Sequence, residues 1–465
     1  MEFCFINNNK PLDRRSQKLV RHHAMKGKNT GKTFRLRGHK RQQHKDEIQL
    51  DRWTTEGGKG RPLLPKFAQA NSLLPVNPFP GTELTYFTTS ITLTPSVRYL
   101  FHEFHNEVSK KLYPQTFCRQ SKELESSWFE LVIGNPSVFH CAMAVTRARI
   151  SRHQGYNAQS IESNSHLIQA LRLLRNDLES SFKPQDSSIV VAISLAIYAN
   201  ISGSFKESLI HLQGLKLMLE MLPGGLAVLC QKAPELGNKI RRTDLELALM
   251  TGTSTRFGSQ QLTTPMPLYV VPLYDKKSSI ALPDSLSEAS LEVRSAMVDM
   301  LALCSYAGSA QLSAFQYQDL IISIGQHLSD YAPLNGERPP QPLDDICQLG
   351  LLAFMSTFLS HPREVHPTYF TLLSDLFRSR LEVFGSLPDN KSSLSLWLIF
   401  IHALSSPNYE ECCQADSFVV MNIRALATTL VLETWQDVAG HLTLYPWVAA
   451  FHDEKSKKVW DAVYK

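Results

Sequence analysis

Positive charge is concentrated at the start of this chain, and that concentration limits which residues can join a folded core. Residues 1–45 carry 13 lysines and arginines against two acids, a net charge of +11. The rest of the chain carries 35 basic and 41 acidic side chains, a net charge of −6. A block of like charge repels itself and lacks core-forming residues, so it stays solvated and attracts polyanions. The sequence therefore predicts a disordered basic arm over 1–45, joined to a nearly neutral body.

A proline- and glycine-rich stretch follows the arm. Five prolines and four glycines fall between residues 57 and 81. Proline removes a backbone N–H and resists helix continuation, so we interpret 46–84 as a linker. The folded body is expected over 85–465, a length that can bury a substantial apolar core.

Apolar residues in the body recur every three to four positions, which predicts amphipathic helices. Leu209, Leu212, Leu215, Leu219 and Leu222 form one such stripe. Similar periodicity marks the segments 97–108, 167–178, 287–306, 310–331, 342–360, 366–385, 393–405, 417–437 and 440–452. We expect one short extended piece, at 268–272. The predicted fold class is therefore all-α, a large irregular helical bundle.

The apolar runs are too short to cross a bilayer. The longest, Ile189–Ala199 and Leu394–Leu404, reach about half of the ~20 residues that a spanning helix needs. We therefore predict core helices there and no membrane partner. The first residues also lack the apolar segment of a secretory signal, so we expect an intracellular protein.

Enzyme motifs and metal sites are not apparent in the body. No GxSxG elbow, P-loop, GxGxxG or HExxH motif occurs, and the eight cysteines include no CxxC pair. His102 and His105 have metal-ligand spacing, but we favour the wet face of an amphipathic helix. Adjacent Asp344 and Asp345 are interpreted as first-turn helix acids that complement the dipole. The sequence predicts no catalytic, cofactor-binding or metal-binding residue.

Two neighbouring segments carry a family resemblance. HLQGLKLMLEMLPGG (211–225) combines a leucine stripe with an interior glycine, Gly214, which suggests close helix–helix approach. It is followed by KIRRTDLELALMTGTSTRF (239–257). The pair resembles the signatures of the fungal-specific transcription factor domain, the helical regulatory region of zinc-binuclear-cluster transcription factors. The resemblance implies similar helical content over about residues 90–460.

The opening residues add to this resemblance. FCFINNNKP and the basic segment RSQKLVRHHAMKGK resemble the start of relatives in that group, which often lack the zinc cluster. The six-cysteine DNA-binding module is absent from this sequence too. The resemblance therefore implies the regulatory body, and does not extend to sequence-specific reading of DNA.

The arm suits two functions that need only charge density. Clustered lysines and arginines are recognised by import receptors, and they contact phosphates of nucleic acid with a steep salt dependence. The candidate residues are Arg14, Arg15, Lys18, Arg21, Lys26, Lys28, Lys32, Arg35, Arg37, Lys40 and Arg41. We expect weak or non-specific DNA contact through them.

Taken together, the sequence predicts a fungal nuclear transcriptional regulator. Its helical body would contact other regulatory proteins or a second copy of itself, and its arm would serve import and electrostatic contact with DNA. The alternative is an α-helical scaffold or adaptor that does not bind DNA.

Overall fold

The computed structural model describes residues 94–104, 113–114, 116–118, 131–180, 183–258, 277, 279–309, 312–359, 370–384 and 391–464. All of them belong to one compact unit, residues 76–465. The basic arm, the linker and the extended piece expected at 268–272 lie outside the described residues.

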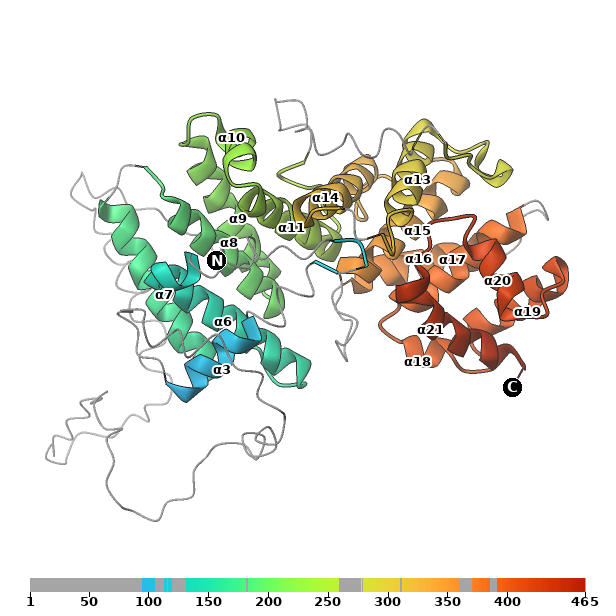
Figure 1. Ribbon diagram of the computed structural model, residues 1–465, viewed down its shortest axis with the longest axis horizontal. Coiled ribbons are helices and arrows are strands. Elements are labelled where there is room, and N and C mark those ends of the chain that lie inside the picture. The colour runs from blue at the N-terminus through green and yellow to red at the C-terminus, as the bar shows by residue number, and fades with distance from the viewer. Residues whose placement is uncertain are drawn as a thin grey trace, which may run out of the picture. The chain divides into compact units, whose positions relative to one another are not determined.

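The described part of the chain is built from α-helices, which confirms the predicted all-α class (Figure 1). The first group comprises α3 (Pro95–Glu103), α6 (Pro136–His153), α7 (Ile161–Ser180), α8 (Asp186–Ile201), α9 (Phe205–Glu220), α10 (Gly225–Lys232) and α11 (Pro234–Thr251). The second group comprises α13 (Leu291–Cys304), α14 (Ala314–Tyr331), α15 (Pro342–Leu359), α16 (Thr371–Phe384), α17 (Ser392–Ser405), α18 (Tyr409–Cys412), α19 (Phe418–Leu430), α20 (Trp435–Leu442) and α21 (Ala449–Asp461), with the 3-10 turns η6 (Asp284–Leu286) and η8 (Ala462–Tyr464). No β-strand forms among these residues, although an isolated parallel bridge pairs Cys118 with Leu312.

Several helices begin at side chains that satisfy otherwise free N–H groups of the first turn. Ser313 and Gln316 form a reciprocal capping box at the start of α14. Asn135 caps α6, and Pro136 follows it at a position where the missing N–H costs nothing. Such caps fix where a helix starts, which apolar periodicity alone does not do.

Two hydrophobic cores form, and α11 contributes to both. The first core gathers buried side chains of α3, α6, α7, α8 and α9, and Ile240 and Leu247 of α11 belong to it. The second core gathers those of α13 to α21, and Leu245 and Leu249 of α11 belong to that one. At roughly 100° per residue these two pairs lie on opposite faces of the helix. Helix α11 is therefore packed from both sides.

Most predicted helical segments are confirmed, but two boundaries near the C-terminus were wrong. The segment predicted as one helix over 417–437 is instead α19, which ends at Leu430, and α20, which begins at Trp435. The helix expected at 440–452 is instead the end of α20 followed by α21. The break occurs at Val431, whose φ of 54° is left-handed. Thr434 then caps α20 and forms a capping box with Asp437.

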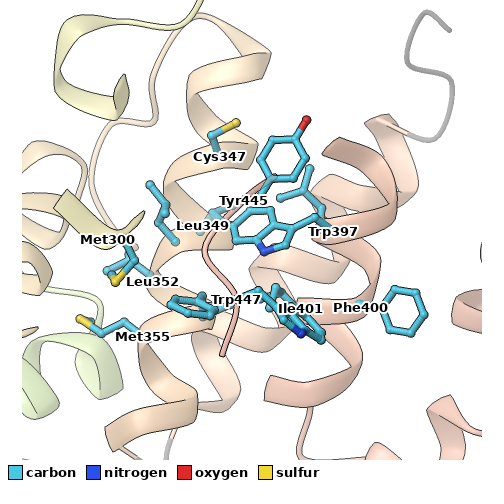
Figure 2. Close-up of a cluster of buried hydrophobic side chains, with 14 of the residues drawn as sticks. Met300, Cys347, Leu349, Leu352, Met355, Trp397, Phe400, Ile401, Tyr445 and Trp447 are labelled. Carbon is cyan, nitrogen blue, oxygen red and sulfur yellow. The ribbon is translucent and has the colours of Figure 1, made fainter. Parts of the chain in front are cut away.

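A layer of aromatic side chains fills the middle of the second core (Figure 2). Trp397 of α17 stacks on Tyr445 with ring centroids 5.6 Å apart, and its Nε1 donates to the Pro446 carbonyl at 2.9 Å. Helix α15 approaches this indole closely at Gly350, where a Cβ would lie 2.5 Å from Leu398 Cδ2 and 3.1 Å from Trp397 Cζ3. Glycine is therefore needed at this helix crossing.

His452 is buried as a neutral ring in the same core. Its Nδ1 accepts the Val448 N–H at 3.1 Å, and its Nε2 lies 3.0 Å from Thr357 Oγ1. Since the Thr357 hydroxyl donates to the Phe354 carbonyl, Nε2 carries the proton and donates to Thr357. Burial, with a smaller contribution from the nearby Lys455 charge, lowers the pKa of His452 to about 3.

We predict that this domain loses stability as pH falls from about 6.5 to 4. Burial lowers the pKa values of His140 and His402 to about 4 as well, whereas unfolded histidine titrates near 6.5. Between these pH values the unfolded chain binds more protons than the folded one. The free energy of unfolding is therefore highest above pH ~6.5 and decreases as the pH falls below that value. Asp244, whose pKa burial raises to about 6, acts with the opposite sign but is one group against three.

Urea unfolding between pH 7 and 4.5 measures this effect. The variant His452→Asn, whose carbonyl can still accept the Val448 N–H, should show a shallower loss of stability with acid. Phe358→Leu, a change in the ring that packs 5.7 Å from His452, is the control that lowers stability without removing a titrating group. An unchanged pH slope in His452→Asn would contradict the assignment.

Replacing Val431 by glycine should stabilise the fold. A residue other than glycine in the left-handed region costs about 1–2 kcal/mol of folding free energy. Glycine removes that cost, but it destabilises the fold by about 0.5–1 kcal/mol because its unfolded chain has more conformational entropy. Val431 is exposed, so little packing is lost, and we expect Val431→Gly to gain about 0.5–1 kcal/mol in urea unfolding. Thr428 is exposed within helix α19, so the control variant Thr428→Gly should instead lower the free energy of unfolding by a similar amount.

Candidate functional site

The eleven arm cations that the sequence singles out, from Arg14 to Arg41, lie outside the described residues. The family-like segments 211–225 and 239–257, in contrast, are almost wholly described, and they form α9, α10, α11 and the turn that follows α11. The candidate site is therefore built from these helices and the partners of their polar side chains.

The leucine stripe of α9 faces the first core as predicted. Leu212, Leu215 and Leu219 are buried there. Gly214 was expected to allow close helix approach, and that prediction was wrong for the described part of the chain, where a Cβ at Gly214 would meet nothing within 4 Å. The glycines of the following turn are required, since Gly224 has a φ of +77°, and α10 leaves the axis of α9 at 86°.

Asp244 closes the turn after α11. Its buried carboxylate accepts the backbone N–H groups of Arg256 and Phe257, and Arg256 Nη1 lies 3.6 Å from its Oδ1. Burial still raises the pKa of Asp244 to about 6, partly offset by those two hydrogen bonds. The Arg-x-Asp element at 242–244 therefore has a structural role: it folds the chain back beside α11.

Arg241 joins α11 to α14 through a buried ion pair. Its guanidinium donates to Asp319 Oδ1, to Ser323 Oγ at 2.8 Å, and to Gln326 Oε1 at 3.1 and 2.9 Å. Asp319, Ser323 and Gln326 recur at helical spacing, so they share one face of α14. Asp330 continues that face by one turn and accepts from the Thr255 N–H and hydroxyl.

These contacts form a continuous line, which we call the α11–α14 seam, defined by Arg241, Asp244, Asp319, Gln326 and Asp330. Gln326 completes it by donating to the Phe257 carbonyl at 2.9 Å. A neighbouring arginine, Arg242, extends the connection to Gln318 and to the Leu359 carbonyl at the end of α15. Buried polar groups on both helices are thus matched with one another.

The sequence analysis missed this seam, although a signal was present. Arg241 falls on the same face of α11 as Leu245 and Ala248, which are both buried. A charge on an apolar face indicates a buried partner, because an unpaired charge there would cost several kcal/mol. The partner, 78 residues away, has no local pattern that pairs it with Arg241.

Asp344 and Asp345 lie in the first turn of α15, as predicted. Asp344 accepts the Ser290 N–H at the start of α13 at 2.8 Å. Asp345 is paired with Arg338 at 2.6 Å and with Arg380 at 2.9 Å. The two carboxylates therefore connect helices of the second core, and both are engaged within the chain.

The cysteine side chains named next are buried or half-buried in the described part of the chain, where they pack against their neighbours. Burial raises the thiol pKa of Cys141, Cys304 and Cys347 to about 12, so they are not thiolate nucleophiles at neutral pH. Among the described residues, no three His, Cys, Asp or Glu side chains are placed to hold a metal ion. His102 has weak contact with Glu103, and His105 lies outside the described residues.

The described helices differ in length and hydropathy from the helices that span a bilayer. None of them alone is long and apolar enough to span one, and two bent pairs, α9 with α10 and α19 with α20, reach the threshold only when taken together.

The fold and the seam define an all-helical domain whose signature polar residues serve its own architecture. A family model of the fungal specific transcription factor domain matches residues 99–348. This match covers more than half of the 465 residues, and the chain belongs to that family, whose members are transcriptional regulators. Neither the curated proteins nor the solved structures contain a significant match to the chain.

Removing one partner of the buried Arg241–Asp319 pair should destabilise the fold far more than removing one partner of a surface pair. We expect Arg241→Ala to cost about 3–5 kcal/mol of unfolding free energy, because Asp319 is left charged and unpaired. Arg175→Ala, which breaks an exposed pair with Glu179, should change the unfolding free energy very little, because solvent screens that pair. The double variant Arg241→Met with Asp319→Leu should recover most of the loss. Equal effects of Arg241→Ala and Arg175→Ala in urea unfolding would contradict the role of the seam.

Proposed function

We propose that this protein is a fungal nuclear transcriptional regulator whose helical body acts through protein contacts. Family membership carries the proposal. It is supported by the chemistry of the body, where the carboxylates, arginines and thiols described above are committed to internal hydrogen bonds, ion pairs or packing. Such a body offers surfaces to partners, while the reactive groups named above are engaged within it.

The basic arm supplies the nuclear address and an electrostatic contact with DNA. Its +11 charge is held in residues 1–45, a density that import receptors and the phosphate backbone both recognise. Contact with phosphates releases counterions, so eight such contacts would give a slope of about −7 in log K against log salt. Base-specific reading is not part of the proposal.

A helical scaffold without a DNA role is the second candidate. The exposed apolar side chains of α9 are compatible with it, because they suit protein partners as well in a scaffold as in a regulator. The two candidates differ only in what the arm does, so an experiment on the arm separates them.

Neutralising the arm should abolish nuclear accumulation and weaken DNA binding. The variant changes Arg14, Arg15, Lys18, Arg21, Lys26, Lys28, Lys32, Arg35, Arg37, Lys40 and Arg41 to glutamine in the full chain. We expect binding to duplex DNA at 50 mM salt to fall by more than tenfold, and the salt slope to flatten. The matched control changes an equal number of exposed lysines and arginines in the body, such as Arg175, Arg378 and Lys458.

The localisation readout uses a fluorescent fusion in a fungal cell. Cytosolic protein with the neutralised arm and nuclear protein with the body control would support the regulator. Nuclear localisation and DNA affinity that ignore the arm would favour the scaffold.

A further inference from the structure

Helix α9 has a second apolar face, directed away from the core that its leucines enter. Ile210, Leu217 and Met221 are 60%, 54% and 57% exposed. At roughly 100° per residue they lie opposite the buried Leu212, Leu215 and Leu219. Gly214 falls between them, and the space above it is open. A helix that is apolar on two sides ordinarily has a partner on each.

The spacing of these four residues is the same when read from either end of the helix. Ile210 and Met221 are the outer pair, and Gly214 and Leu217 are the inner pair, with equal spacing about the midpoint. In an antiparallel pairing of two α9 helices, Ile210 therefore meets Met221 of the other copy. Leu217 of each copy then projects over Gly214 of the other, where no described residue of the same chain would lie within 4 Å of a Cβ.

Charge on one flank of this face is complementary in the antiparallel pairing. Lys206, Gln213 and Glu220 recur every seven residues along that flank, and all three are exposed. Antiparallel helices bring the same flanks together in reverse order. Lys206 of one copy then comes within about 8 Å, measured along the axis, of Glu220 of the other.

We propose that this outward face, defined by Ile210, Gly214, Leu217 and Met221, is a docking surface for α9 of a second copy of this chain. The pairing is isologous: each copy supplies the same surface about a two-fold axis. A helix about 24 Å long buries an area at the lower end of specific interfaces. The dimer is therefore weak, with a dissociation constant on the order of 10 μM. This inference deepens the protein-contact role proposed above and rests on it, but it does not involve the arm.

Sedimentation velocity on the full-length protein from 1 to 100 μM tests the proposal. We expect a concentration-dependent dimer that Leu217→Glu weakens at least tenfold. Leu171→Glu is the matched control, because Leu171 is also exposed, at 42%, on another helix, α7. A monomer throughout this range, or equal effects of the two variants, would overturn the proposal.

Cross-linking tests the direction of the helices. The double variant Ile210→Cys with Met221→Cys should form a disulfide-linked dimer under mild oxidation, above the background of the native cysteines. Ile210→Cys alone should not, because the two copies of residue 210 are about 16 Å apart in the antiparallel pairing. A dimer linked through residue 210 alone would overturn the antiparallel arrangement.

Charge reversal provides the third readout, and it does not depend on apolar residues. Lys206→Glu and Glu220→Lys should each weaken the dimer, and the double reversal should restore it. DNA binding measured on the same variants should be unchanged. If the dimer fails while arm-dependent DNA binding persists, the docking proposal falls and the regulator proposal stands. If the dimer forms as expected but DNA binding does not depend on the arm, the docking proposal stands and the regulator proposal falls.

Discussion

The burial of α11 between two hydrophobic cores is the constraint on which the rest of this domain depends. One face of the helix carries Ile240 and Leu247 into the first core, and the other carries Leu245 and Leu249 into the second. The α11–α14 seam adds a buried ion pair, Arg241 with Asp319, at the same place. Separating the cores would expose apolar surface on both sides and leave buried charges without partners, which costs several kcal/mol.

This arrangement explains what the family signature does in the chain. The Arg-x-Asp element folds the turn after α11 and, through Gln326 and Asp330, fastens it to α14. These groups are engaged within the chain, so contact with other molecules is left to the outward faces of the helices and to the basic arm. A buried pair of this kind adds less to stability than apolar packing would, and we interpret it as a device that selects one arrangement of α11 on α14.

The sequence was sufficient for the parts of this fold that local periodicity determines. The helices at 342–359 and 392–405 are found within one residue of their predicted bounds, because long apolar patterns repeat there. The break at Val431 was missed, since a β-branched residue rarely adopts a left-handed conformation. The seam was missed because its partners are distant in sequence, and Gly214 was misjudged because an interior glycine can also lie on an open helix face.

Native-state hydrogen exchange in increasing urea tests most directly whether α11 holds the two cores in one cooperative unit. The amides of α8 report on the first core and those of α17 on the second. The account predicts that the slowest amides of both helices exchange with the same opening free energy and the same urea dependence, because neither core opens without the other. Exchange of α8 at a distinctly lower urea concentration than α17 would show that the first core unfolds by itself, and would contradict the account.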